Sequence, residues 1–200
     1  MSKLLNVSSS PHVRCGVSTK NLMYDVAIAM LPATIWGVMQ FGIYSLIVVV
    51  ATVLSCVLSE YLFETLMHKP VTISDGSALV TGMILGLNMP PAIPLWMPIL
   101  GGVFAIIVVK QLYGGLGQNW MNPALAARCF MLISFAQAMT KFTDPVTDAV
   151  ASATPLAAIK AGDTYDLAAM FIGKIPGPIG EVSVIALLIG AAYLLVKKVI

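Results

Sequence analysis

Two long apolar segments stand almost end to end near the N-terminus, and they limit the fold more than any other feature. They span residues 22–41 and 43–66, and only Gly42 separates them clearly. An α-helix needs about 20 apolar residues to cross the hydrocarbon core of a bilayer. Because both segments reach that length, the sequence predicts two membrane helices joined as a tight hairpin at Gly42.

Four further apolar segments follow along the chain. Residues 95–112 can also cross, 123–139 are slightly short, 182–195 with their flanks make another helix, and 77–87 are too short to cross alone. The chain is 58% hydrophobic and 10% charged, whereas a soluble domain has about 25% charged residues. We therefore expect an all-α, polytopic membrane bundle. A net charge of +2 gives no reason to expect nucleic acid as a partner.

Lysine and arginine in short loops set the orientation of a membrane protein, because they stay on the cytoplasmic side. The short connections near Gly42 and at 88–94 contain neither residue, so they are assigned to the outer side. The N-terminus is then cytoplasmic and the long segment 140–180 extracytoplasmic. The basic residues assigned to the inner side are Lys3, Arg14, Lys20, Lys69, Lys110, Lys197 and Lys198.

The stretch SDGSALVTGMILGLNMPP, residues 74–91, begins like a helix and ends at prolines. Ser74 or Asp75 can cap it, because a side-chain oxygen accepts a free backbone N–H at a helix start. Ala78, Gly82 and Gly86 are four residues apart and share one face, the small-residue pattern that lets membrane helices approach closely.

The stretch GGLGQNWMNPALAARCF, residues 114–130, resembles the first, with Asn122 as the cap and Pro123 as the first helical residue. Broken helices in transporters direct their N-termini at a buried ion or anion. This interpretation places a buried polar site near Asp75, Asn122 and Arg128. The alternative is two short helices with ordinary caps, with Arg128 extending to the cytoplasmic interface.

Few side chains suggest catalysis or metal binding. Glu60 and Glu64 are one turn apart near the inner end of the second helix, where they form either a cation site or an interfacial charge cluster with His68 and Lys69. The three cysteines are far apart and lack a histidine at ligand spacing, so no metal site made by this chain alone is expected. No acid–base catalytic group is expected either.

The segment ASATPLA, residues 151–157, predicts a helix start in the outer loop. Thr154 would be the N-cap, Pro155 the first helical residue, and Gly162 would end the helix. A helix start also favours a phosphate, because free N–H groups and the positive end of the dipole both attract an anion. The small residues Ser152 and Ala153 leave room for a modifying enzyme.

Together with SSSPHVR before the first helix, these three motifs resemble one family over the whole chain. The sequence is similar to RnfD, a membrane subunit of the ion-translocating ferredoxin:NAD oxidoreductase, and more distantly to NqrB of the sodium-pumping NADH:quinone reductase. In this family FMN is joined through its phosphate to a threonine at the end of an S-x-A-T-like motif. The resemblance implies covalent FMN on Thr154, beside Ser152, Ala153 and Pro155, and allows a second flavin, riboflavin.

The resemblance also implies an architecture and a function. The fold resembles urea channels and has about ten helices in two inverted five-helix halves. Residues 21–139 would be the first five-helix repeat, after a cytoplasmic segment 1–20, and the flavin-bearing loop 140–180 leads to a sixth helix at 181–200. We therefore expect a fragment of a longer subunit. It would relay electrons between ferredoxin and NAD in the bacterial inner membrane, with subunits A, B, C, E and G, coupled to Na⁺ or H⁺ export.

Two other interpretations remain open at this point. A solute or ion channel of urea-channel-like fold would need no flavin, and small-residue rows suit any closely packed bundle. A purely structural membrane scaffold would carry neither flavin nor solute. In that case replacement of Arg128 or Asp75 would affect assembly alone.

Overall fold

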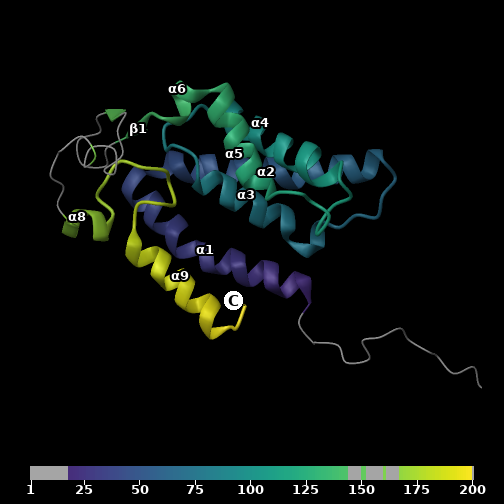
Figure 1. Cartoon of the computed structure of the whole chain (residues 1–200), viewed down its shortest axis with the longest axis horizontal. Helices are drawn as coiled ribbons and strands as arrows, with labels where there is room; N and C mark the ends of the chain where they lie inside the picture. Colours follow the sequence, from purple (N-terminus) through teal and green to yellow (C-terminus); the bar gives the residue numbers. More distant parts are fainter. Residues whose placement is uncertain (1–17, 144–149, 152–159, 161–166, 200) are drawn as a thin grey trace, which may run out of the picture.

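The computed structural model describes residues 18–143, 150, 151, 160 and 167–199. Nearly all regular structure in this part of the chain is helical (Figure 1). The elements are α1 (Thr19–Phe41), α2 (Ile43–Leu66), the 3₁₀ turn η1 (Ile73–Asp75), α3 (Ser77–Leu87), α4 (Trp96–Val103), the π-helix η2 (Phe104–Gln111), α5 (Pro123–Ser134), α6 (Ala136–Met139), β1 (Phe142–Thr143), β2 (Val150–Ala151), α8 (Leu167–Ile172) and α9 (Val184–Val196).

Helices α1 and α2 form the predicted hairpin. Gly42 lies between them with φ 80°, a conformation that glycine adopts without steric cost. Both helices are long and apolar enough to cross a membrane. The structure confirms α2 and α3 with the bounds expected from the sequence, and α1 begins three residues earlier than expected, at Thr19.

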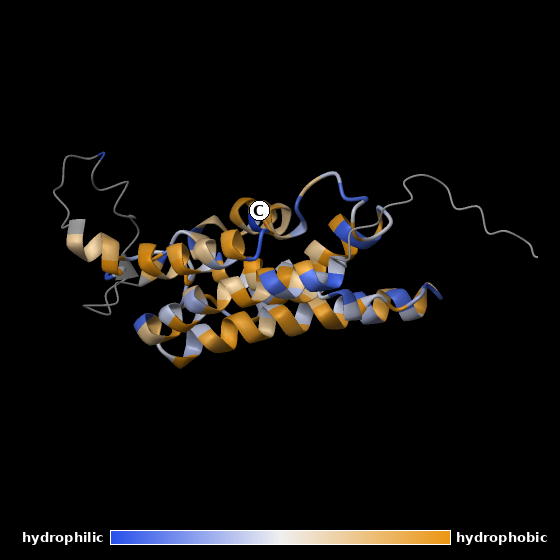
Figure 2. Ribbon diagram, turned by 90° about the horizontal axis from the view of Figure 1, so that it is seen from below, coloured by the Kyte–Doolittle hydropathy of each residue, from blue (hydrophilic) through white to orange (hydrophobic). Residues whose placement is uncertain are grey.

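Helix α2 has the residue distribution of a membrane helix. Its outward face carries Leu54, Leu58 and Leu62, each more than half exposed, while Ser55 and Ser59 are buried. A soluble helix shows the reverse distribution, because its apolar residues face the core. Figure 2 shows apolar residues along most of each helix, which fits a bundle surrounded by lipid.

Helix α3 packs on α2 through the predicted row of small residues. A Cβ atom on Gly82 would lie 2.6 Å from Cα of Val53, and one on Gly86 would lie 3.0 Å from Cα of Val49. The backbones therefore approach too closely for a larger side chain. This contact confirms the packing role expected of the row.

The later helices agree with the expectation in part. The segment 95–112 is continuous, with α4 passing directly into η2. The segment 123–139 was expected as one helix, but Phe135 leaves helical geometry, with φ −132° and ψ 46°, and separates α5 from α6. The prediction of a single helix here is wrong, and no glycine or proline marks the break in the sequence.

Helix α9 lies alongside α1 at the edge of the bundle (Figure 1). A Cβ atom on Gly190 would lie 2.3 Å from the carbonyl oxygen of Ala29, so this contact also depends on a glycine. The two-residue strands β1 and β2 pair antiparallel, with Phe142 opposite Ala151. In the described residues they are the only departure from the expected all-α fold.

Candidate functional site

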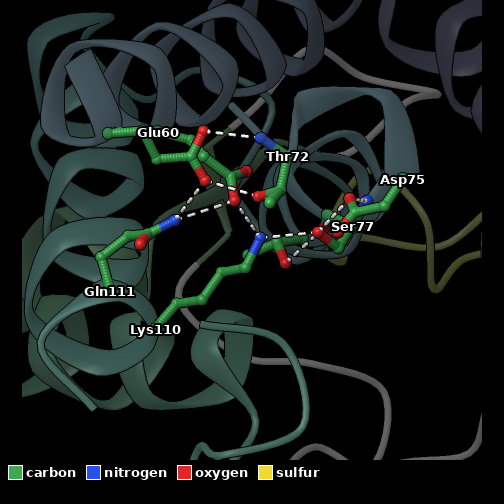
Figure 3. A network of polar contacts seen from close by, with 8 residues as sticks. Glu60, Thr72, Asp75, Ser77, Lys110 and Gln111 are labelled. Carbon is green, nitrogen blue, oxygen red and sulfur yellow. Dashed lines mark hydrogen bonds and ion pairs between the residues drawn. The ribbon is translucent and has the colours of Figure 1, made fainter. Parts of the chain in front are cut away.

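A polar network with a buried centre lies where α2, α3 and η2 meet (Figure 3). Its centre is the ion pair of Glu60 and Lys110, whose side chains are 0% and 2% exposed. The ammonium of Lys110 donates to Oε1 of Glu60 at 2.5 Å and to Oγ of Ser77 at 2.6 Å. Lys110 thus joins α2 to the first residue of α3. The name polar network is used below for Glu60, Glu64, Thr72, Asp75, Ser77, Lys110 and Gln111.

Gln111 links the two glutamates of α2. Its Nε2 donates to Oε1 of Glu60 at 2.9 Å and to Oε1 of Glu64 at 3.2 Å. Glu64 also accepts from Thr72, at 2.9 Å from the backbone N–H and at 2.5 Å from the hydroxyl. Both carboxylate oxygens of Glu64 are therefore satisfied.

Asp75 closes the network on the side of α3. Its Oδ1 accepts the backbone N–H of Ser77 at 2.8 Å and the Ser77 hydroxyl at 2.5 Å. The Ser77 hydroxyl consequently connects Lys110 to Asp75. Gly76, with φ 78°, lies between Asp75 and the first residue of α3. The expectation that a side-chain oxygen of Ser74 or Asp75 bonds a free N–H at this helix start is confirmed for Asp75.

The π-helix η2 places two consecutive residues in the same network. Such segments are rare and often occur at functional sites. Here Lys110 and Gln111 both reach Glu60. The sequence counted Lys110 among the basic residues of the inner side, and the structure shows that it lies within η2 and is buried, not in a loop. Two acidic residues one turn apart were a sign that α2 needs a cationic partner.

Glu60 and Glu64 are buried, at 0% and 2% exposure, so the expected interfacial charge cluster is not formed. Lys69 lies over the ring of Phe63 at 5.2 Å instead. One fully buried oxygen of the network, Oε2 of Glu60, has no hydrogen-bond partner among the described residues.

Asn122 caps α5 as expected. Its Oδ1 accepts the backbone N–H of Ala124 at 3.0 Å, and Pro123 is the first helical residue. Asn122 also lines a cavity of about 330 Å³ together with Ser77 and Lys110. The two interrupted helices therefore begin beside the same cavity, which borders the polar network.

Arg128 belongs to a different place in the bundle. One of its guanidinium N–H groups donates to Oδ1 of Asn88, at the C-terminal end of α3. Both residues line a cavity of about 450 Å³ beside α1 and α9. Arg128 thus bonds inside the bundle, and its expected extension to the cytoplasmic interface is not observed. Asp75 is linked to the 330 Å³ cavity only through Ser77, which lines it together with Asn122, whereas Arg128 has a separate partner.

The residues expected to hold the flavin, Ser152, Ala153, Thr154 and Pro155, lie outside the described residues. Ala151 is the last described residue before them, and it pairs with Phe142. The neighbouring Lys141 lines a cavity of about 710 Å³ with Met97 and Phe135. The described residues contain no group of three potential metal ligands.

These features define a polytopic helical membrane protein with interrupted helices and a charged network buried between them. The chain belongs to the NQR2, RnfD, RnfE family, whose sequence model matches residues 6–200.

Three relatives illustrate the similarity. The D subunit of the Na(+)-translocating ferredoxin:NAD(+) oxidoreductase complex of Acetobacterium woodii is 47% identical over 98% of this chain and 64% of its own length. The D subunit of the proton-translocating ferredoxin:NAD(+) oxidoreductase complex of Clostridium ljungdahlii is 41% identical, with the same coverage. The D subunit of an ion-translocating oxidoreductase complex of Shewanella denitrificans is 40% identical over 78% of this chain and 45% of its own. The chain thus spans less than two thirds of these relatives.

Proposed function

We propose that this chain is the flavin-bearing part of a membrane subunit in an ion-translocating ferredoxin:NAD oxidoreductase. FMN joined through its phosphate to Thr154 would relay electrons between ferredoxin and NAD, coupled to translocation of Na⁺ or H⁺. The observation that carries this proposal is 47% identity, over 98% of the chain, to a subunit named for that reaction.

The described residues near Thr154 suit a flavin. Three residues extend at most about 11 Å, so Thr154 is never farther than that from Ala151 along the chain. Ala151 pairs with Phe142, next to Lys141 and the 710 Å³ cavity. Phe135 and Met97 give this cavity an apolar wall, while Ser134, Gln137 and Lys141 supply polar groups. Ligand sites typically combine these two kinds of lining.

The flavin would supply the redox chemistry, and the protein would position it and set its potential. The apolar wall would exclude water from the ring. The Lys141 ammonium would stabilise negative charge on the reduced flavin. No acid–base group of the chain is needed for electron transfer.

The orientation, the two-half architecture, the partner subunits and the second flavin are proposed because this chain resembles the family. The N-terminus would be cytoplasmic and the Thr154 loop extracytoplasmic, in the inner membrane of a bacterium. The described helices would form the first of two inverted halves, together with the start of the second. Subunits A, B, C, E and G would be the protein partners, and riboflavin would be a second, non-covalent flavin.

The test is the ultraviolet fluorescence of the protein band in a denaturing gel, after co-expression with the flavin transferase. A fluorescent wild type beside a dark Thr154→Ala variant is the expected result. Fluorescence in both would place the flavin on another residue. If both are dark, solute flux should be measured in vesicles, because a flavin-free channel then becomes the better explanation.

A further inference from the structure

The polar network contains more negative than positive charge. Its carboxylates are Glu60 and Glu64, which are buried, and Asp75, which is partly exposed, and its one ammonium is Lys110, which leaves a formal charge of −2. Uncompensated charge inside a membrane protein is costly. The network is therefore suited to take up a further positive charge.

Two buried oxygens without hydrogen-bond partners lie in the surroundings of Lys110. One is Oε2 of Glu60, the residue with which Lys110 is paired. The other is Oδ1 of Asn119, and Asn119 lines the same 330 Å³ cavity as Lys110. Buried oxygens are normally hydrogen-bonded, so each of these two calls for an explanation. A second position for the ammonium accounts for the free oxygen of Asn119, and a further cation beside Glu60 accounts for its free Oε2.

The chemistry of lysine suits such movement. Its ammonium has three N–H donors on a flexible four-carbon stem. Two of these donors bond Glu60 and Ser77, and the third has no acceptor among the described residues. Rotation of the stem can redirect the ammonium into the cavity while η2 stays fixed.

We propose that Lys110 is a tethered cation that competes with a monovalent cation, H⁺ or Na⁺, for Glu60. When the cation reaches Glu60, the ammonium moves into the cavity and donates to Oδ1 of Asn119. When the cation leaves, the ammonium returns. The formal charge of the network changes from −2 to −1 on uptake. Lys110 is thus a positioning residue that sets the cation affinity of Glu60.

This inference rests on the proposed function, because ion-coupled electron transfer provides the readout. The assembled complex is assayed for ferredoxin-dependent NAD⁺ reduction against Na⁺ at fixed pH, and against pH without added Na⁺. Lys110→Met removes the competitor. The half-saturating Na⁺ concentration should fall about tenfold, the amount expected from one charged hydrogen bond, or the pH of half-activation should rise.

Asn119→Leu should have the opposite effect. It removes the acceptor that receives the displaced ammonium, so Lys110 remains on Glu60 and half-saturation requires a higher Na⁺ concentration or a lower pH. Met121→Leu is the matched control, because Met121 lines the same cavity and its side chain has no oxygen. A fixed structural ion pair would not produce shifts of opposite sign. If Lys110→Met does not assemble, Asn119→Leu decides the question alone.

The outcomes separate the inference from the proposed function. A wild-type complex without covalent flavin would refute the proposed function. A flavin-bearing complex whose activity responds to Na⁺ or to pH in the same way in the wild type and in both variants would refute the inference alone. The inference is also refuted if Asn119→Leu leaves the half-saturating Na⁺ concentration and the pH of half-activation unchanged, or if both variants shift these values in the same direction. The response to Na⁺ or to pH identifies which cation competes with Lys110.

Discussion

The ammonium of Lys110 lies 2.5 Å from a carboxylate oxygen of Glu60, a residue 50 positions earlier in the chain. Burial removes the water that would otherwise solvate both charges. The attraction of a buried pair compensates for this loss only while both partners and their additional hydrogen bonds are present. Ser77 and Gln111 supply those bonds here.

The first prediction concerns the stability of this pair. Lys110→Met leaves Glu60 buried beside an apolar side chain, and we expect a loss of roughly 3–5 kcal/mol in the free energy of unfolding. The double variant Glu60→Leu/Lys110→Met should recover most of that loss. Denaturation of the detergent-solubilised chain measures the unfolding free energy of the single and the double variant. Lys69→Met, at an exposed lysine, is the control. A double variant as unstable as the single one would contradict the argument.

The sequence predicts the long helices well because their determinants are local. The length of an apolar run sets α2, and the cap Asn122 with Pro123 sets the start of α5. The small-residue row of α3 indicates which face packs closely. Each of these features is contained in a window of the chain no longer than α2 itself.

The interior of the site is harder to predict, because it depends on which helices become neighbours. Counting basic residues near helix ends treated Lys110 as a charge of the inner side, but could not show that Glu60 on α2 pairs with it inside the bundle. Arg128 likewise finds Asn88, 40 positions away. The break at Phe135 also lacks a local signal. Long-range pairing decides the positions of Lys110 and Arg128.

The second prediction concerns the contact between α2 and α3. Gly82→Ala places a methyl group 2.6 Å from Cα of Val53, and a backbone atom cannot move aside easily. Gly101→Ala meets Cγ of Met131 at 3.3 Å, and this flexible side chain can adjust. We therefore expect Gly82→Ala to cost about 1–3 kcal/mol, and Gly101→Ala to cost less. Thermal unfolding in detergent ranks the stability of the two variants, and equal losses of stability would contradict the packing argument.

The third prediction concerns Arg128 and Asn88. Arg128→Leu leaves the amide of Asn88 without its donor, and we expect a loss of about 1–3 kcal/mol. Asn88→Leu in the same chain should restore part of this loss, since the unpaired amide is then removed. Measured unfolding free energies of both single variants and the double variant form the cycle that isolates the pair. Additive losses would show that the hydrogen bond contributes little.

The fourth prediction tests whether the flavin proposed on Thr154 lies beside Lys141. A positive charge near the ring favours the reduced flavin, which is the more negative form. Lys141→Met should therefore lower the midpoint potential, by about 30 mV if the redox equilibrium changes tenfold for a two-electron couple. A spectroelectrochemical titration of the purified protein measures the shift, and gel fluorescence verifies that the covalent flavin is retained.

Lys174→Met is the control, because Lys174 is exposed and does not line the cavity. An unchanged potential at full flavin occupancy would mean that the ring lies elsewhere. Loss of the fluorescent band would instead assign Lys141 to the attachment step.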